Sequence, residues 1–397
     1  MPQHERYRST ADGFYFATGL VVLQNGQRLL AYNEAAAGLW ARLETGASID
    51  DLGDQLVNEY GLFPDQARED AQNIVDDWLS LGVVERSGIS EVRGRGASAP
   101  IADTTGFPPQ AERESSLPHS STPWATLCAG RAIGFSVDDP WLEALLRHQF
   151  PESDGVSAAL ATTVQIRRAP GDQLLLSIDG RERVRSTQIH EVLGILIQEL
   201  VEFLHPGREF LAFMHGGAVA KNGRAYAFAA PSGSGKSTLV AYLNHKGYRF
   251  LSDDVIVLSG PEGLVLSFPA AISIKAGSVG VLSTFYPSLA SASAVPSIKG
   301  NLRFIRPEES ETCWDADIPL HALIFPRYDP TSPSELVGLA PLEALVRLVA
   351  DNVWLGHPIA RAKLQSFLDW LEGVPSYSLR FNDLNEAGLL LDRLAYE

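Results

Sequence analysis

The sequence predicts an α/β protein in which a small domain, made of a β-hairpin and three helices, precedes a larger domain of alternating strands and helices. Three observations carry this prediction. Apolar residues recur at spacings of three and four over residues 67–81, as they do on one face of a helix. An Asn25-Gly26 pair separates two short apolar runs, as in a tight hairpin. The glycine-rich segment APSGSGKST, residues 230–238, stands between an apolar strand-like run and a helix-like run.

Length and composition limit the class of protein. A chain of 397 residues predicts two or three domains, and 45% hydrophobic with 20% charged residues is typical of globular proteins that bury a core. Cys128 and Cys313 lie far apart in no metal-like spacing, so both are expected to be buried as small apolar residues. The polar N-terminus predicts no secretory signal, and no apolar run reaches about 18 residues, so we expect a cytoplasmic protein without membrane contact.

Charge argues against a nucleic-acid partner. The net charge is −16, and residues 1–90 hold 14 acidic residues against 6 arginines, a local net charge of −8. A polyanion is repelled by such a surface, because binding it requires lysine and arginine side chains that neutralise phosphates.

The small domain is expected to start with the hairpin. Residues 20–23 and 28–31 flank Asn25-Gly26, which suits a type I′ turn because both positions tolerate positive φ. Asn33 can cap a helix that runs to Leu43, with Gly46 just past its end.

Two more helices are expected to follow. Ser48 and Asp51 form a capping-box pattern that starts a helix to about Tyr60. Pro64 can occupy the first turn of a third helix that ends at Gly82. A hairpin with three helices predicts a winged-helix-like domain over residues 1–88.

The rest of the chain is predicted to be a linker and one larger domain. Residues 89–123 are rich in Gly, Ser, Pro and Ala without an apolar period, which predicts a flexible linker. The larger domain spans residues 124–397, with strands near 164–166, 174–178, 210–219, 225–229, 248–251 and 256–258, helices near 188–204 and 236–246, mixed strands to 336 and a helical C-terminus from 341. The βαβ pattern places the glycine-rich loop at the C-terminal end of a strand.

The glycine-rich loop predicts a phosphate site. Gly233 and Gly235 allow backbone amides to converge on an anion at the start of a helix. Lys236 would contact the terminal phosphates, and Ser237 would offer a hydroxyl to Mg²⁺. The predicted nucleotide-binding residues are Ser232, Gly233, Ser234, Gly235, Lys236, Ser237 and Thr238. A glycine- and serine-rich loop without a ligand is the competing interpretation, but the strand before the loop and the helix after it favour phosphate.

A carboxylate pair follows at a useful distance. Asp253 and Asp254 stand 16 and 17 residues after Ser237, which is a helix and a strand later, so the chain can return beside the loop. One carboxylate could help Ser237 to hold Mg²⁺, and the other could accept a proton from an attacking hydroxyl. A solvated turn with two acids is the alternative. Lys275, an isolated base in an apolar run, could contact phosphate or peptide, but a solvated lysine is the favoured interpretation.

Residues 215–258 resemble the HPr kinase/phosphorylase family, related in fold to phosphoenolpyruvate carboxykinases. In that family a histidine precedes the P-loop lysine by 21 residues, as His215 precedes Lys236, and a catalytic aspartate follows the P-loop serine by 17, as Asp254 follows Ser237. The resemblance implies a kinase using ATP and Mg²⁺, with Asp254 as general base and His215 and Lys236 as further catalytic residues. Gly277-Ser278-Val279 stands where the family has an acidic metal ligand, so no residue is carried over for it, and Asp253 is expected to help Ser237 to hold the metal instead.

The N-terminal region is similar to PqqD-like domains, which recognise peptides for ribosomal peptide modification enzymes. The similarity is carried by LLAYNEAAAGLWARLETGASIDDL and EYGLFPDQAREDAQNIVDDWLSLGVV. It implies that a leader peptide adds as a strand to the hairpin edge and packs on the third helix.

The two resemblances together imply an ATP-dependent serine/threonine kinase of a precursor peptide, like the kinases of lasso peptide clusters. Two other interpretations stay open: a kinase of a carrier protein or a small hydroxylated metabolite, and a nucleotide-dependent peptide chaperone without catalysis. Related kinases form rings, so a homo-oligomer is left open as well.

Overall fold

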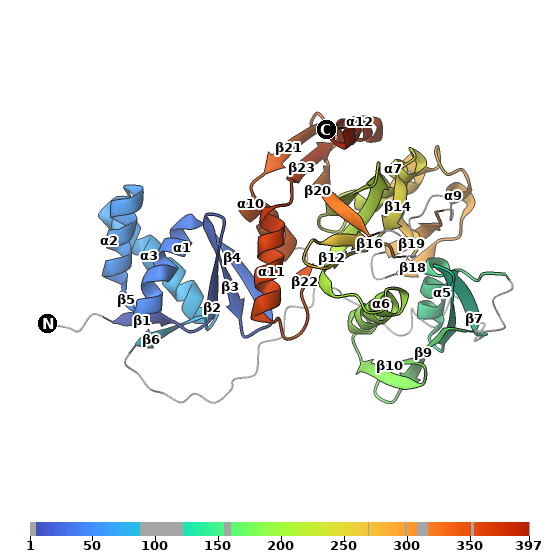
Figure 1. Ribbon diagram of the computed structural model, residues 1–397, viewed down its shortest axis with the longest axis horizontal. Coiled ribbons are helices and arrows are strands. Elements are labelled where there is room, and N and C mark those ends of the chain that lie inside the picture. The colour runs from blue at the N-terminus through green and yellow to red at the C-terminus, as the bar shows by residue number, and fades with distance from the viewer. Residues whose placement is uncertain are drawn as a thin grey trace. The chain divides into compact units, whose positions relative to one another are not determined.

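The computed structural model describes residues 5–87, 122–154, 160–268, 270–297, 300–307, 317–350 and 353–396. The chain divides into two compact units. One comprises residues 1–101 with 338–376, and the other comprises residues 102–337 with 377–397. Figure 1 labels the helices and strands of both units.

The smaller unit joins the N-terminal region to a later segment of the chain. Its strands are β1 (Arg6–Ser9), β2 (Asp12–Phe16), β3 (Gly19–Gln24), β4 (Arg28–Tyr32), β5 (Ala47–Ser48), β6 (Val84–Ser87) and β22 (Val353–Trp354). Its helices are α1 (Glu34–Thr45), α2 (Ile49–Tyr60), α3 (Pro64–Ser80), α10 (Pro341–Ala350) and α11 (Arg361–Glu372). The first two sheets have the strand orders β5-β1-β6 and β2-β3-β4.

The three predicted helices form, the first two at side-chain caps and the third at a proline in its first turn. The Asn33 side chain accepts a hydrogen bond from the Ala36 N–H at 3.0 Å, and Ser48 and Asp51 form the complete capping box. Pro64 begins α3. Asn25 and Gly26 both have positive φ, as a type I′ turn requires, but Gln24 pairs with Arg28, so the hairpin loop contains three residues instead of two.

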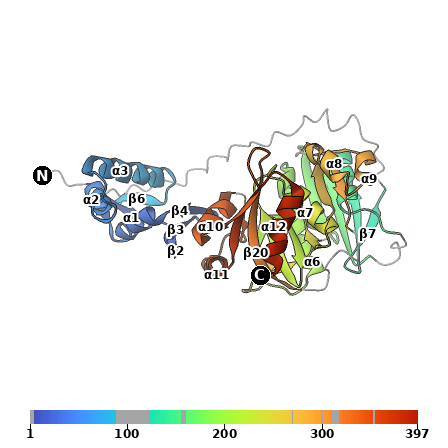
Figure 2. The same cartoon turned by 90° about the horizontal axis from the view of Figure 1, so that it is seen from above.

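The β2-β3-β4 sheet is covered on both faces. On one face, Leu20 and Val22 belong to the core with Trp40 of α1, and a Cβ on Gly13 would lie 2.4 Å from the Trp40 indole nitrogen. On the other face, β2 contacts α11 and β4 contacts α10. Figures 1 and 2 show the sheet between the N-terminal helices and the two later helices. Burial on both faces explains why β3 is an unbroken apolar run.

Arg361 fixes α11 to the second face of this sheet. Its guanidinium donates to the Asp12 carboxylate at 2.6 Å and lies over the Phe14 ring, 4.8 Å from the centroid. The predicted domain boundary assigned α10 and α11 to the larger domain. In the structure they group with the N-terminal unit.

The larger unit contains a five-stranded sheet and a central sheet. The first has the order β11-β10-β9-β8-β7, made of β7 (Trp124–Cys128), β8 (Arg131–Val137), β9 (Thr162–Ala169), β10 (Gln173–Ile178) and β11 (Arg181–Ser186). The second runs β13-β12-β15-β16-β20-β23-β21, with β14 also paired to β12. Its strands are β12 (Phe210–Lys221), β13 (Arg224–Ala229), β14 (Arg249–Ser252), β15 (Val255–Ser259), β16 (Leu264–Leu266), β20 (Ile318–Tyr328), β21 (Glu335–Leu339) and β23 (Ser376–Phe381).

Helices and a small sheet complete this unit. The helices are α5 (Pro140–Gln149), α6 (Ile189–Leu204), α7 (Lys236–His245), α8 (Ala276–Leu282), α9 (Ser288–Ser291) and α12 (Leu384–Tyr396). The small sheet has the order β17-β19-β18, from β17 (Ile272–Lys275), β18 (Val295–Ser297) and β19 (Gly300–Ile305). Helices α7 and α12 contact each other and share one hydrophobic core. Figure 2 shows the two helices side by side.

The central sheet differs from the predicted βαβ pattern in one respect. Strands β13 and β14 flank α7 in sequence, but β12 lies between them and pairs with both in antiparallel register. The parallel neighbour of β13 is β20, which comes about 90 residues later in the chain. The loop after β13 still lies at the C-terminal end of a strand, as the sequence predicted, although the strands beside β13 differ from the predicted ones.

The structure also bears on the predicted fold class, the C-terminal region and the two cysteines. The α/β class is confirmed, and the described part of the C-terminal region from Pro341 holds the helices α10, α11 and α12 with two short strands, β22 and β23, between them. Cys128 is buried, with 3% of its surface exposed, and burial raises the pKa of its thiol to about 12. Cys313 and most of the predicted linker lie outside the described residues.

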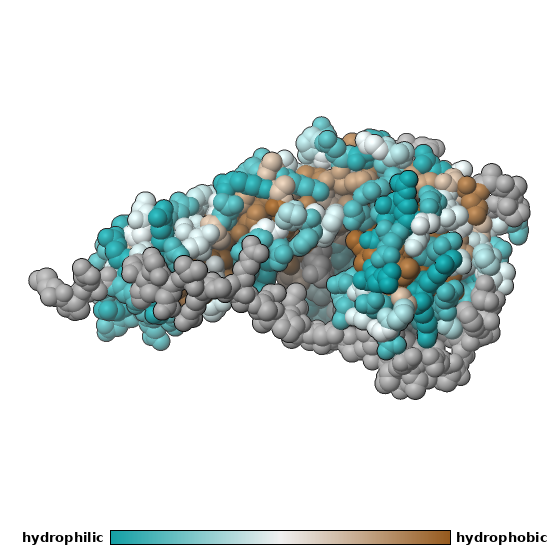
Figure 3. Space-filling model, turned by 90° about the horizontal axis from the view of Figure 1, so that it is seen from below, coloured by the Kyte–Doolittle hydropathy of each residue, from teal (hydrophilic) through white to brown (hydrophobic). Residues whose placement is uncertain are grey.

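No helix within the described ranges is long and apolar enough to cross a membrane. On the face seen in Figure 3, hydrophilic residues cover most of the coloured surface and apolar residues form smaller patches.

Candidate functional site

The glycine-rich loop connects the end of β13 to the first turn of α7. Gly233 and Gly235 have φ values of 93° and 97°, in the left-handed region that favours glycine. A Cβ on Gly235 would lie 3.0 Å from the Phe381 ring, whereas a Cβ on Gly233 would meet no atom within 4 Å. The loop therefore turns tightly against β23 on one side and leaves open space above its backbone on the other.

Lys236 is the first residue of α7 and is buried, with 7% of its surface exposed. Its ammonium group donates to the carbonyl oxygens of Ala230 and of Pro231, the latter at 3.2 Å. The positive charge is thus held inside the loop, next to the N-terminal end of a helix, where an anion is favoured.

The two acidic residues occupy a break between two strands. Strands β14 and β15 pair with the same strand, β12, and Asp253 and Asp254 lie between them. Asp254 has a φ of 68°, a left-handed conformation that is uncommon outside glycine. The break turns the two carboxylates toward the loop and away from the regular alternation of a strand.

Asp253 contacts the loop serine directly. Its carboxylate accepts from the Ser237 hydroxyl at 2.9 Å and from the Ser273 backbone N–H at 3.0 Å, and only 2% of the residue is exposed. The structure therefore brings together the two residues that the sequence assigned to Mg²⁺, with Asp253 behind Ser237.

Asp254 and His215 lie at the cavity itself. The His215 Nδ1 is 3.1 Å from the Asp254 backbone oxygen. Because a carbonyl oxygen only accepts, Nδ1 carries the hydrogen, and the neutral ring has its acceptor on Nε2. The Asp254 carboxylate accepts from the Ser273 hydroxyl at 3.4 Å.

These groups surround one cavity of about 290 Å³, the phosphate cavity. Its lining comprises His215, Ser232, Gly233, Gly235, Lys236, Ser237, Thr238, Asp254, Ser273, Lys275, Gly277, Ser278 and Leu302. Of the predicted site residues, Ser234 and Asp253 are absent from this lining. The Ser234 carbonyl instead accepts from the Tyr328 N–H at 3.0 Å, which joins the loop to the end of β20.

Two glycines of β12 allow the acidic pair to approach the loop. A Cβ on Gly216 would lie 2.3 Å from the Phe228 carbonyl oxygen, and a Cβ on Gly217 would lie 2.8 Å from Val240 and 3.2 Å from the Asp253 carboxylate. The glycines after His215 therefore have a steric role, because any side chain there would separate β12 from β13 and α7.

Sequence reasoning missed two contributors to this cavity and gave a third only as an alternative. For Lys275 a solvated position was favoured over contact with phosphate or peptide, and in the structure its ammonium group donates to the Ser232 hydroxyl at 2.8 Å across the cavity. Ser273 donates to both aspartates, and Ser278 bonds to Thr238 at 2.7 Å. All three come from β17 and α8, and only the alternation of Ser273 and Lys275 on β17 places them on a common face.

Within the residues that the structure describes, no group of three or more His, Cys, Asp or Glu side chains is arranged to hold a metal ion by itself. Ser237 and Asp253 could hold Mg²⁺ together with the oxygens of a bound polyphosphate, which is how this ion is usually bound. Uncharged Gly277 and Ser278 line the cavity where the HPr kinase family has an acidic ligand.

The strand, loop, helix and carboxylate pair define an α/β protein of the P-loop class. A comparison with protein families finds a match in the N-terminal unit. Residues 19–84 match the family described as coenzyme PQQ synthesis protein D (PqqD). The predicted PqqD-like domain is thereby confirmed.

Among solved structures, the HPr(Ser) kinase/phosphatase from Coxiella burnetii is similar, with 12% sequence identity and a TM-score of 0.23 over 46% of this chain and 88% of that chain. A comparison with curated proteins gives no match. The comparisons therefore assign a PqqD-like domain to residues 19–84 of the chain.

Proposed function

We propose that this protein is an ATP-dependent kinase that phosphorylates a Ser or Thr hydroxyl of a ribosomally made precursor peptide. The observation that carries the proposal is the placement of Asp254 and His215 in the same cavity as the loop glycines, Lys236 and Ser237. A loop that binds a polyphosphate and a carboxylate facing its open end are the two parts that phosphoryl transfer to an alcohol requires.

The transfer step follows from these positions. The Asp254 carboxylate accepts the proton of the acceptor hydroxyl, and the oxygen forms a bond to the γ-phosphorus. The bond from that phosphorus to the bridging oxygen breaks, and ADP leaves with the electron pair. Lys236 and Lys275 stabilise the negative charge on the phosphates during this exchange. His215, which bonds to the Asp254 backbone, holds the strand break in place and orients the carboxylate.

The cavity fits the implied nucleotide and metal. The glycine backbone leaves open space at Gly233, two lysines border the cavity, and Ser237 with Asp253 offers oxygen donors. A Mg²⁺ held there would neutralise charge between the phosphates.

The PqqD-like domain supports a peptide as the acceptor. Its β2-β3-β4 sheet is covered on both faces, so a peptide can join it only along an edge, by backbone pairing. Binding the leader there would raise the local concentration of the core peptide at the phosphate cavity to the millimolar range.

The proposal is tested by mass spectrometry with ATP, Mg²⁺ and the precursor peptide encoded beside this protein. The wild-type protein should add about 80 Da, the mass of one phosphate, to a serine or threonine. Asp254→Asn should lower kcat by about 10²–10⁴-fold while ATP binding is retained, because the general base is lost.

Asp172→Asn is a matched control. Asp172 also has a positive φ, 56°, but it lies in a surface turn of the five-stranded sheet. Its variant should phosphorylate the peptide at the wild-type rate. ATP binding without any release of γ-phosphate to peptide would contradict the kinase and favour a nucleotide-dependent chaperone.

A further inference from the structure

A second cavity, of about 320 Å³, adjoins the phosphate cavity in the larger unit. We call it the apolar pocket. Its lining comprises Leu145, Leu146, Gln149 and Phe150 at the end of α5, His190, Leu193, Gly194, Leu196 and Ile197 on α6, and His215, Asp253, Asp254, Val255, Phe268, Ala270, Ser297 and Leu302. Its volume is near the lower end of the range of about 300–1,000 Å³ that is usual for ligand pockets.

The apolar pocket and the phosphate cavity meet at the catalytic pair. His215, Asp254 and Leu302 line both of them. A phosphate held by the loop and a group held in the apolar pocket would therefore reach Asp254 from two sides. This is the relation that a donor and an acceptor must have for in-line transfer.

The chemistry of the lining selects what can enter. Most of its side chains are aliphatic or aromatic, and none of the described lining residues is Lys or Arg. Asp253 and Asp254 are the acidic groups at its inner end. An anionic group would be repelled by these carboxylates and would lose its hydration without a cationic partner, so it is excluded. An uncharged apolar side chain gains free energy from the same burial.

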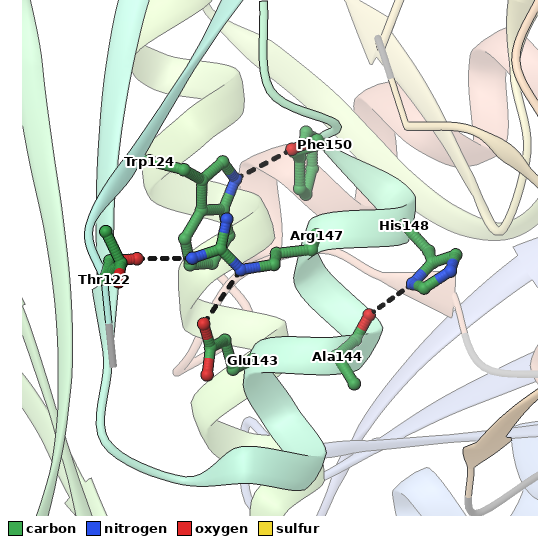
Figure 4. A network of polar contacts seen from close by, with 7 residues as sticks. All are labelled: Thr122, Trp124, Glu143, Ala144, Arg147, His148 and Phe150. Carbon is green, nitrogen blue, oxygen red and sulfur yellow. Dashed lines mark hydrogen bonds and ion pairs between the residues drawn. The ribbon is translucent and has the colours of Figure 1, made fainter. Parts of the chain in front are cut away.

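The outer wall of the apolar pocket is held rigidly. The Arg147 guanidinium lies over the Trp124 ring, 4.2 Å from its centroid, and donates to Glu143 at 2.8 Å and to the Thr122 carbonyl. The Trp124 indole N–H donates to the Phe150 carbonyl at 2.9 Å. Figure 4 shows these contacts tying the last turns of α5 to the strand that begins at Trp124. These contacts anchor the end of the helix that carries Leu145 and Leu146, and an anchored wall loses less conformational freedom when a ligand binds.

We propose that the apolar pocket binds the large aliphatic or aromatic side chain next to the acceptor Ser or Thr, so that the enzyme selects an apolar core sequence around the modified hydroxyl. This rests on the proposed kinase activity and adds its acceptor specificity. The leader would determine which peptide is bound, and the apolar pocket would determine which hydroxyl receives phosphate.

Gly194 offers a direct test of this assignment. It lies within α6, where glycine costs about 1 kcal/mol of helix stability relative to alanine. A Cβ there would meet no atom within 4 Å, and the residue lines the apolar pocket, so a larger side chain would fill the space. Gly280 of α8 is the matched control, because a Cβ on it also meets no atom within 4 Å and it is absent from both linings.

The experiment measures transfer from labelled ATP to three versions of the precursor that differ only in the residues beside the modified hydroxyl: leucine, aspartate or glycine. The wild-type protein should prefer the leucine version over the aspartate version by at least about tenfold in kcat/KM. Gly194→Leu should raise KM for the leucine version about tenfold or more. The affinity of Gly194→Leu for a fluorescent ATP analogue should equal that of the wild-type protein. Gly280→Leu should leave the preference for leucine over aspartate, the KM for the leucine version and the affinity for the ATP analogue unchanged.

The outcomes separate the two claims. Phosphate transfer at equal rates to the three peptides, or equal losses in the two glycine variants, would overturn the apolar pocket as the acceptor site and leave the kinase in place. ATP binding without transfer to any of the three peptides would overturn the kinase itself.

Discussion

Asp254 combines a strained backbone with the proposed catalytic carboxylate. Its φ of 68° places a Cβ-bearing residue in the left-handed region, which costs roughly 1–2 kcal/mol. The neighbouring strands pair with β12 on both sides of it, so the surrounding structure maintains this conformation. Strain that is kept at a carboxylate facing the phosphate cavity fits a residue selected for chemistry over stability.

This strain predicts a difference between two variants that both remove the carboxylate. Asp254→Gly should unfold at a higher urea concentration than Asp254→Ala, with about 1 kcal/mol more free energy of unfolding, because glycine adopts positive φ without steric cost. Neither variant should transfer phosphate. Equal stability of the two variants would show that the backbone at Asp254 is unstrained.

The hairpin edge is the element on which peptide recognition depends. Among the described strands, β4 pairs only with β3, so its other edge can accept a further strand. Both faces of this sheet are occupied by helices, which leaves backbone pairing as the available mode of binding.

Hydrogen exchange tests this assignment. Adding the precursor peptide should slow exchange of backbone amides in residues 28–32, because a leader paired with β4 protects them from water. Strand β11, also an edge strand, is the internal control and should exchange at an unchanged rate. Protection of β2 without protection of β4 would move the leader to the opposite edge of the sheet.

The stability of the whole chain should depend on pH through His205, at the end of α6. Its Nε2 lies 2.8 Å from the Ser267 carbonyl oxygen. Burial lowers the pKa of this imidazole, and the bond to Ser267 opposes that effect without cancelling it. Arg208 and Arg131 lower the pKa further, while Asp317 raises it. Because the pKa is lower in the folded state, the unfolded chain binds the proton first, and stability falls as pH drops through about 6.5.

His205→Gln isolates this contribution. Glutamine can still donate to the Ser267 carbonyl but does not titrate. Between about pH 7.5 and pH 5.5 the wild-type protein should lose more free energy of unfolding in urea than His205→Gln does. An equal loss in both proteins would assign the pH dependence to other groups.

Features that depend on residues close together in the sequence were predictable, and features that depend on long-range contacts were not. The helices of the small domain were predicted from their caps, since Asn33, Ser48 and Asp51 act within one turn. The phosphate loop was predicted for the same reason, because its glycines, Lys236 and the following helix are contiguous.

Strand order was not predictable in this way. Strand β20 becomes the parallel neighbour of β13 across about 90 residues, and no local pattern specifies such a pairing. Ser273 and Lys275 lie on β17, which pairs with β19 in a separate small sheet, and they reach the cavity only through tertiary packing, so they carried no recognisable motif. The apolar pocket likewise combines α5, α6 and β15, which are far apart in sequence.

The placement of α10 and α11 beside the N-terminal sheet affects how this protein can be dissected. Removing residues 1–90 would expose the faces of α10 and α11 that pack against the N-terminal sheet. Apolar side chains such as Leu342, which approaches Gly19, would then face water. A shortened chain could therefore fail through aggregation instead of through loss of leader binding. Point substitutions along the hairpin edge can separate leader recognition from catalysis, because they leave the packing of α10 and α11 on the N-terminal sheet intact.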